Sequence, residues 1–348
     1  MKLLRTTTFL FCSLVHSTFS HASELNLYMW EDTIAPEVIS GWEVQTQTPL
    51  KLAHFDNDDE RSLLMLNSIR LPFDVVVLDN VSAQMYARDD VLENLTELPN
   101  RGHNANIWLE ACGTHAVPYF WGTVGVVYRK SQVANPPQTW ADFMRPDDAL
   151  NGHIGMLNDS VETLLPALNS LGLSPLTSNE ASLRLAYDKL KTFNEGVLTY
   201  EYVLSYIRSH READKLHMAL AYSGDQYSLN RFYVDNDWAY VLPQGKPFIW
   251  VDCLAVSSHS KNKLLAKALL SYLMDPEIAA SNANYIKAAT PNKSAKAYLP
   301  NSYLNDPSLF PNQLQLDQAW MDSELSAENI GIRAKIINNI LKRHEAQY

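Results

Sequence analysis

The stretch Phe248–Val256, FIWVDCLAV, is almost entirely apolar and ends in the polar run 257–260. An apolar run of this length that is bounded by polar residues predicts a buried strand. Residues two apart in a strand point to the same side, so Trp250 and Asp252 present an indole and a carboxylate to one space. Because a buried aspartate is costly without a partner, we expect either an internal Arg or Lys or a cationic ligand from outside to neutralise Asp252.

The sequence before this strand alternates between strand-like and helix-like segments. Residues 25–30, 50–54 and 73–78 have strand patterns, and helical patterns begin at Pro36 and cover 81–88. A β-α-β order predicts a mostly parallel sheet covered by helices. Ligands bind such sheets in the loops after the carboxyl ends of the strands.

A second α/β block follows, and at 348 residues the chain is long enough for two domains or lobes. Its predicted elements are a strand at 153–157, helices at 160–171 and 180–193, and strands at 217–222 and 238–242. Two strand-like runs flank Trp121-Gly122 between the blocks. Helices are predicted at 263–274, 276–284 and 327–342 after the Trp250 strand.

Residues 1–22 have the features of an export signal. Lys2 and Arg5 precede the apolar run 9–15, and Ser20-His21-Ala22 is a small-x-small cleavage site. The apolar run is too short to span a bilayer. We therefore expect export to a soluble periplasmic or extracellular form.

The charge composition and the absence of catalytic motifs limit the kinds of partner and activity that we expect. The chain has 28 Lys and Arg against 39 Asp and Glu, and loss of the leader would remove two of the basic residues. This acidic balance argues against nucleic acid and anionic membranes and favours cationic partners. No Gly-x-Ser-x-Gly, His-Glu-x-x-His, Cys-x-x-Cys or glycine-rich phosphate loop occurs, so we expect no catalytic residue, no metal and no cofactor. A hydrolase with paired carboxylates is the enzyme alternative.

Two acidic clusters each allow a structural and a functional interpretation. Asp159 and Glu162 are three residues apart at a predicted helix start, which fits a capping box. The same spacing would let both carboxylates project into a cleft and bind an ammonium group. The run 56–60 is interpreted as a helix cap with acids in the first turn, because it lacks the glycine and the terminal glutamate spacing of a calcium-binding EF-hand loop.

Five motifs occur in order along the chain: Tyr28-Met29-Trp30, Val117–Gly122 (VPYFWG), Asp159-x-x-Glu162, Trp250–Ala255 (WVDCLA) and Thr290-Pro291-Asn292. In this order they resemble the periplasmic spermidine/putrescine-binding protein family over nearly the whole chain after the leader. The resemblance implies an α/β, two-lobed periplasmic binding protein fold of type II. Each lobe is then a mostly parallel sheet flanked by helices, with two or more crossings between lobes. It places lobe one at 24–125 plus 252–295 and lobe two at 126–251 plus 296–348.

The resemblance also implies a site for a linear polyamine. The ligand-binding residues carried over by position are Trp30, Glu31, Asp32, Asp79, Asp159, Glu162, Tyr222, Trp250 and Asp252. In this set Asp159, Glu162 and Asp252 bind ammonium groups. Trp30 and Tyr222 are aromatic walls, with Tyr222 standing where the family usually has Trp, and Trp250 stacks on the methylene chain.

Several positions depart from the family pattern. Glu31-Asp32-Thr33 replaces Thr-Glu-Tyr, Leu78-Asp79-Asn80 replaces Ser-x-Tyr, and Ala288 and Met321 stand where a Tyr and a Gln are expected. These departures leave the preferred polyamine open and resemble the norspermidine-sensor branch of the family. There the binding protein reports to an inner-membrane cyclic-di-GMP enzyme that controls biofilm formation, whereas other members feed an ABC importer. We expect a monomer whose partner is such a sensor or an ABC permease.

Cys112 and Cys253 remain after the leader, each a few residues from a predicted crossing between lobes. In an exported protein two cysteines can pair if their Cα atoms come within about 7 Å. A disulfide within lobe one and two free thiols are both consistent with the sequence.

Overall fold

The structure is a computed structural model that describes residues 24–55, 61, 65, 72–232 and 237–347. The predicted leader and the acidic run 56–60 lie outside the described residues. Within the described ranges no helix is both long and apolar enough to cross a membrane.

The strands form one continuous sheet that runs through both halves of the molecule, in the order β2-β1-β3-β9-β4-β7-β5-β6, with β10 beside β9 and β8 beside β4. Their bounds are β1 Leu25–Trp30, β2 Leu50–Phe55, β3 Val75–Asp79, β4 Ala116–Arg129, β5 Ile154–Gly155, β6 Val197–Thr199, β7 Met218–Tyr222, β8 Trp238–Val241, β9 Phe248–Val256 and β10 Trp320–Met321. The ladders of β2-β1-β3 and of β7-β5-β6 are parallel, as predicted. The crossing strands β4 and β9 add antiparallel ladders.

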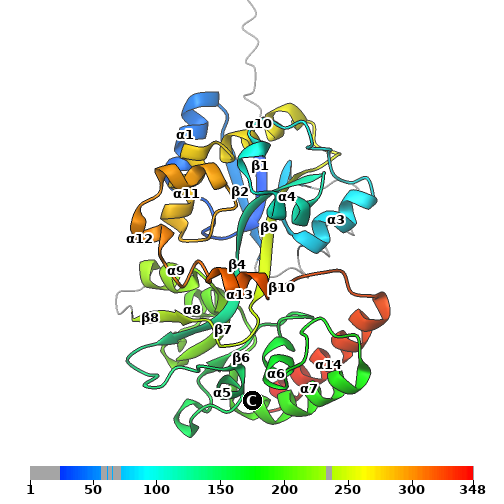
Figure 1. Cartoon of the computed structure of the whole chain (residues 1–348), viewed down its shortest axis with the longest axis vertical. Helices are drawn as coiled ribbons and strands as arrows, with labels where there is room; N and C mark the ends of the chain where they lie inside the picture. Colours follow the sequence, from blue (N-terminus) through cyan, green and yellow to red (C-terminus); the bar gives the residue numbers. More distant parts are fainter. Residues whose placement is uncertain (1–23, 56–60, 62–64, 66–71, 233–236, 348) are drawn as a thin grey trace, which may run out of the picture.

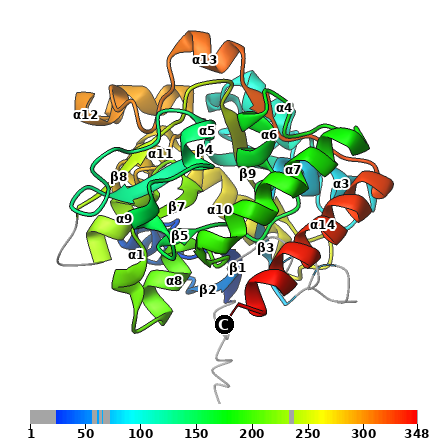
Figure 2. The ribbon, with the colours of Figure 1, turned by 90° about the horizontal axis from the view of Figure 1, so that it is seen from below.

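Helices cover the sheet in both halves (Figure 1). The α-helices are α1 Pro36–Thr46, α3 Asn80–Arg88, α4 Asn106–Cys112, α5 Trp140–Phe143, α6 Leu165–Ser170, α7 Glu180–Phe193, α8 Val203–Ser209, α9 Asp225–Phe232, α10 Lys263–Leu273, α11 Pro276–Ile286, α12 Asn301–Leu304, α13 Gln313–Asp317 and α14 Ala327–Glu345. Short 3-10 helices are η1 Arg101–His103, η2 Asp148–Leu150, η3 Asn194–Gly196, η4 Ala213–Lys215 and η5 Lys293–Tyr298. The last helix, α14, packs beside α7 at the edge of the lower half (Figure 2).

Separate hydrophobic cores define two lobes. The lobe-one core holds buried side chains from 25–121 and 249–309, and the lobe-two cores hold those from 124–248 together with Ile337 and Ile340. The two-lobed fold of type II predicted from the sequence is therefore present, with β4 leaving lobe one and β9 returning to it (Figure 1). The predicted division at residue 295 remains a proposal, and the packing of 299–309 in the lobe-one core favours a later boundary.

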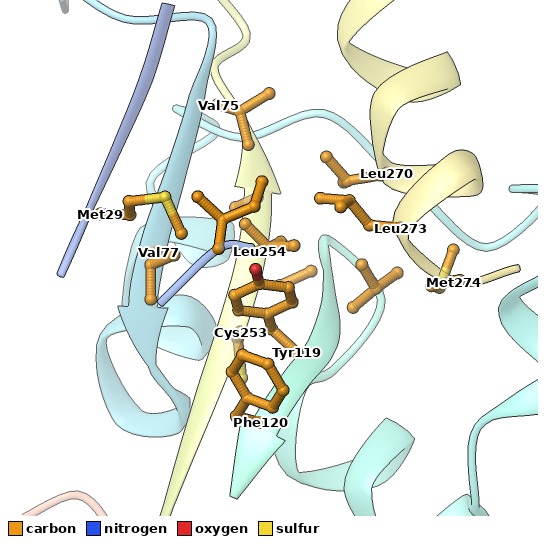
Figure 3. Close-up of a cluster of buried hydrophobic side chains, with 14 of the residues drawn as sticks. Met29, Val75, Val77, Tyr119, Phe120, Cys253, Leu254, Leu270, Leu273 and Met274 are labelled. Atoms are coloured by element: carbon orange, nitrogen blue, oxygen red, sulfur yellow. The ribbon is translucent and has the colours of Figure 1, made fainter. Parts of the chain in front are cut away.

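The two strand-like runs around Trp121-Gly122 are one 14-residue strand, β4. Its register against β9 shifts between Pro118 and Phe120. Proline has no N–H to donate to a ladder, so a bulge is the expected accommodation of Pro118 inside a sheet. The bulge is next to Tyr119, whose ring lies among the buried side chains of lobe one (Figure 3).

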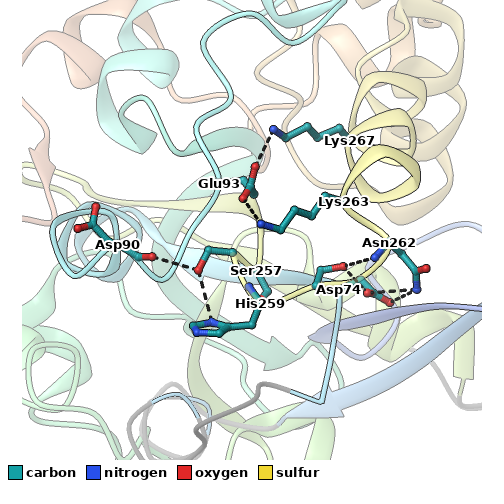
Figure 4. A network of polar contacts seen from close by, with 10 residues as sticks. Asp74, Asp90, Glu93, Ser257, His259, Asn262, Lys263 and Lys267 are labelled. Atoms are coloured by element: carbon teal, nitrogen blue, oxygen red, sulfur yellow. Dashed lines mark hydrogen bonds and ion pairs between the residues drawn. The ribbon is translucent and has the colours of Figure 1, made fainter.

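A polar network holds the far end of β9 in place. The Asp74 carboxylate accepts a hydrogen bond from the Ser260 hydroxyl at 2.5 Å and one from the Asn262 amide (Figure 4). Glu93 pairs with both Lys263 and Lys267 at the start of α10. These contacts tie the loop after β9 to the strands and helix beside it, so the β9 strand is anchored in lobe one.

Candidate functional site

A cavity of about 440 Å³ lies where the two lobes meet. Side chains from both lobes line it, and all nine residues predicted to bind the ligand are among them. The carboxylates that line it are Glu31, Asp32, Asp79, Asp159, Glu162, Asp225, Asp252 and Asp322. The cavity thus brings together residues that lie as far apart in the sequence as Glu31 and Asp322.

Strand β9 supplies the indole and the carboxylate that the sequence places on one face. Trp250 and Asp252 are half-buried and line the cavity, whereas Val251 and Cys253 between and beside them are buried. Gly122 of β4 lies opposite Trp250 in the ladder, and a Cβ atom there would come within 2.5 Å of the Trp250 ring. The missing side chain of Gly122 is therefore what allows the indole to lie against the sheet.

The loop after β1 carries Trp30, Glu31 and Asp32 into the cavity. Asp32 has a left-handed backbone with φ of 59°, a conformation that aspartate adopts more readily than most residues. The Tyr119 hydroxyl donates to the Thr33 carbonyl at 2.6 Å and accepts from Asn282 at 2.8 Å, which holds the loop from behind. Burial, with the neighbouring Glu31 charge, raises the pKa of Asp32.

Asp159 and Glu162 take partly different roles. Asp159 Oδ1 accepts hydrogen bonds from the backbone N–H groups of Val161 and Glu162 at 2.6 and 2.8 Å, as a cap does. The Glu162 Oε2 atom instead accepts from the Tyr222 hydroxyl at 2.6 Å. Capping and projection into the cavity therefore both occur at this pair.

The helix predicted at 160–171 is wrong at its start. Residues 160–164 form turns and α6 begins only at Leu165, with Pro166 in its first turn, where a missing N–H is tolerated. Arg333 of α14 supports these turns from below, donating to the carbonyls of Ser160 and Pro175 at 3.2 and 2.7 Å. The acidic pair is thus held by a turn that α14 supports.

Asp79 lines the cavity and is already paired. It caps α3 by accepting from the Ser82 N–H at 2.7 Å, and its Oδ2 lies 2.6 Å from the Arg61 guanidinium, which is fully buried. Burial opposes ionisation of Asp79, but Arg61 and the Ser82 hydrogen bonds outweigh it and lower its pKa. Its role toward a ligand stays a prediction.

The sequence patterns did not identify Tyr202 and Asp225 as site residues. The Tyr202 hydroxyl donates to Asp225 Oδ1 at 2.6 Å, and the Tyr222 N–H donates to Oδ2 at 2.8 Å. Burial raises the pKa of Asp225 to about 7. A usable signal was present, because Asp225 follows the carboxyl end of β7 in a parallel part of the sheet.

Other missed residues are Arg208, Lys287 and Asp322, which also line the cavity. Asp322 follows β10, and its carbonyl accepts from the Asn80 amide at 3.0 Å. Ala288 lines the cavity where a tyrosine was expected, whereas Met321 is not among the described lining residues and packs against the lobe-one core. The next residue, Asp322, therefore lines the wall, and Met321, which stands where a Gln was expected, does not.

Four aromatic rings form a row across the cavity. Ring centroids are separated by 6.2 Å between Trp30 and Tyr202, 5.7 Å between Tyr202 and Tyr222, and 5.8 Å between Tyr222 and Trp250. Each ring has a carboxylate close to it. Glu31 and Asp32 follow Trp30 in the sequence, and Asp252 lies two residues after Trp250. The hydroxyl groups of Tyr202 and Tyr222 donate hydrogen bonds to Asp225 and Glu162. Apolar faces therefore alternate with anionic groups along the row.

The charge of the wall is strongly negative. Among the described lining residues, eight are acidic and three are basic, Arg61, Arg208 and Lys287. No group of three or more His, Cys, Asp or Glu side chains in the described part of the chain is arranged to hold a metal ion. An organic cation with several charges and apolar segments is the ligand that this wall complements.

Comparisons with known proteins agree with this geometry. Residues 57–311 match the family described as bacterial extracellular solute-binding protein. The chain is 55% identical to the norspermidine sensor of Vibrio cholerae, over 94% of this chain and 91% of that protein. It is 25% identical to a putrescine-binding periplasmic protein of Pseudomonas aeruginosa, over 87% and 88%.

A solved structure gives the same result for the fold. A putative spermidine/putrescine ABC transporter protein from Listeria monocytogenes superposes with a TM-score of 0.79 at 25% identity, covering 91% of this chain and 98% of that one.

Proposed function

The chain belongs to the bacterial extracellular solute-binding protein family, and on that premise we propose that it is a periplasmic receptor for polyamines of the norspermidine and spermidine type. The observation that carries the proposal is the row of four aromatic rings with carboxylates beside them in the cavity between the lobes. Along a polyamine, ammonium groups alternate with short apolar chains. The wall alternates carboxylates with aromatic rings, so the ligand matches it both in charge and in the order of its polar and apolar parts. Of the nine predicted residues, Trp30, Asp159, Glu162, Tyr222, Trp250 and Asp252 keep their binding role as part of the proposal, whereas Glu31, Asp32 and Asp79 line the cavity paired with arginines.

The energetics require several contacts at once. An ammonium group over an aromatic ring is worth about 0.5–2 kcal/mol, and a hydrogen bond to a charged group about 1.5–3 kcal/mol. Desolvation of the ions opposes both. Micromolar affinity needs about 8 kcal/mol, so we propose that the lobes close on the ligand and bring Trp30 and Asp252 against Asp159 and Glu162.

We further propose that the closed form signals to a membrane-bound cyclic-di-GMP sensor enzyme that controls biofilm formation. The support for this step is the 55% identity to a protein named as a norspermidine sensor. The alternative is that the protein is the substrate-binding component of a polyamine ABC importer, as the name of the Listeria structure suggests for that protein. A periplasmic hydrolase is the enzyme alternative, although the relatives are named as binding proteins and sensors.

Titration of the purified protein with putrescine, norspermidine and spermidine tests the binding function. Trp30 and Trp250 lie in the cavity wall, so we expect a saturable change in tryptophan fluorescence with at least one of the three. No saturable response to any polyamine would remove the receptor proposal, and turnover of a bound amine would favour the enzyme. For the partner, the protein is captured from solubilised membranes, and an importer permease in the eluate would count against the sensor.

A further inference from the structure

An arginine of lobe two reaches into the acidic end of the cavity. The Arg208 guanidinium, on α8, lies 2.6 Å from Glu31 Oε2 and 3.5 Å from Asp32 Oδ2, which belong to the loop after β1 in lobe one. All three side chains line the cavity, and those of Arg208 and Asp32 are only about a quarter exposed. This ion pair joins the two lobes at the Trp30 end of the aromatic row.

The two acids have little freedom to move away from the arginine. Their loop is tied down by the hydrogen bonds of Thr33 with Tyr119 and Trp30, at 2.6 and 2.8 Å. The two carboxylates are adjacent in the chain and repel each other, so a cation is needed between them. Arg208 supplies this cation.

We propose that Arg208 is a specificity-determining residue that closes the Glu31–Asp32 end of the cavity to ligand ammonium groups and thereby limits the length of the bound polyamine. The inference rests on the polyamine-binding function proposed above. A guanidinium at these carboxylates occupies their acceptor sites and repels an incoming ammonium group. The ligand's charges then bind at Asp159, Glu162 and Asp252, and the two carboxylates at the Trp30 end are not available to the additional nitrogen of a longer amine.

Arg61 is the second arginine of the cavity wall, and it is less suitable for substitution than Arg208. Arg61 pairs with Asp79 in the same manner, but its side chain is fully buried. Removing it would leave a buried carboxylate without its cation and destabilise the fold. Arg208 is partly exposed at 26%, so its removal leaves a site that solvent or ligand can fill.

The experiment replaces Arg208 with methionine, which keeps an apolar stem and removes the charge. Wild type and Arg208→Met are titrated with norspermidine, a triamine, and with spermine, a tetra-amine. We expect the affinity for spermine relative to norspermidine to rise tenfold or more in the variant, because Glu31 and Asp32 become available to a further ammonium group. Arg208→Gln, which keeps polar contacts, serves the same purpose if the methionine variant does not fold.

Two further variants separate specificity from simple loss of a contact between lobes. Arg88→Met removes the Arg88–Glu324 pair, 2.8 Å, which lies outside the cavity lining, and should leave the ratio of affinities unchanged. Asp32→Asn added to Arg208→Met should reduce the gain, because only Glu31 then remains for the further ammonium group, and asparagine tolerates the left-handed backbone at this position.

The outcomes are distinct. A ratio that rises in Arg208→Met and falls back in the double variant supports the proposal. An unchanged ratio, or equal weakening of both amines, would show that Arg208 only holds the lobes together and would overturn it. If the wild type binds no polyamine at all, the proposed function itself fails and this inference falls with it.

Discussion

Asp252 is the carboxylate on which the proposed binding of a cation depends most directly, because it lies two residues from Trp250 on the strand that returns to lobe one. We expect Asp252→Asn to weaken polyamine binding tenfold or more, about 1.4 kcal/mol, since an amide offers no negative charge to an ammonium group. Fluorescence titration measures the change. Asp188→Asn is the matched control, because Asp188 lies on the exposed face of α7 and pairs with Lys191. Equal affinity of wild type and Asp252→Asn would exclude Asp252 from the site.

Asp225 makes the stability of the protein depend on pH. Burial raises its pKa to about 7, whereas an aspartate in the unfolded chain ionises near pH 4. Between these values the folded state holds a proton that the unfolded state has lost, so stability falls as the pH rises toward 7. Raising the pH from 5 to 8 should therefore lower the free energy of unfolding by about 2–3 kcal/mol through the ionisation of Asp225.

The matching variant is Asp225→Asn, which cannot ionise; its amide oxygen can accept from the Tyr222 N–H, and its amide NH2 can donate to the Tyr202 hydroxyl oxygen. Denaturant unfolding at pH 5 and pH 8 compares the two proteins. Between pH 5 and pH 8 we expect the free energy of unfolding to fall by about 2–3 kcal/mol less in the variant than in the wild type. An identical pH profile would show that Asp225 is not the group responsible.

At the scale of elements, the β4–β9 pair sets the position of the aromatic wall. Gly122 lies opposite Trp250, and a methyl group at Gly122 would force the indole out of its place. We expect Gly122→Ala to weaken polyamine binding by the worth of a cation–π contact, about 0.5–2 kcal/mol, and to shift the tryptophan emission of the protein without ligand.

The control for this change is Gly102→Ala in η1, where nothing lies within 4 Å of an added Cβ atom. This variant should bind as the wild type does. If Gly122→Ala also kept wild-type affinity and emission, the contact between β4 and the Trp250 ring would not position the wall.

At the scale of the whole molecule, a disulfide joins the two places where the chain leaves and re-enters lobe one. Cys112 and Cys253 are bonded, with Cα atoms 5.7 Å apart and 141 positions apart in the sequence. Of the two states that the sequence left open, the structure has the disulfide. Both residues are buried in the lobe-one core, and the loop that they close contains most of lobe two.

We expect the double variant Cys112→Ala/Cys253→Ala to lose about 2–5 kcal/mol of unfolding free energy, because the bond restricts the unfolded chain. Its polyamine affinity should remain, since neither cysteine lines the cavity. Denaturant unfolding and thiol counting under denaturing conditions check both statements. Two free thiols in the exported wild-type protein would contradict the bond itself.

The local pattern of the sequence was sufficient for most elements and for the kinds of residue in the site. Alternation and apolar runs predicted β1, β3, β7 and β9, because the order of polar and apolar residues along a strand follows the burial of its side chains. It was less reliable at 160–171, where Pro166 delays the helix and Arg333, from far along the chain, stabilises a turn.

What the sequence by itself determined is six of the eight acids that line the cavity and three of the four rings of the aromatic row, including Trp250 and Asp252 on one face of a strand. What only the tertiary structure decided is which of them meet: the Cys112–Cys253 bond, the Tyr202–Asp225 hydrogen bond and the pairing of Arg208 with Glu31. The reason is physical. Periodicity reports how each residue is oriented on its own element, whereas contacts between distant residues depend on strand order and on how the two lobes approach each other.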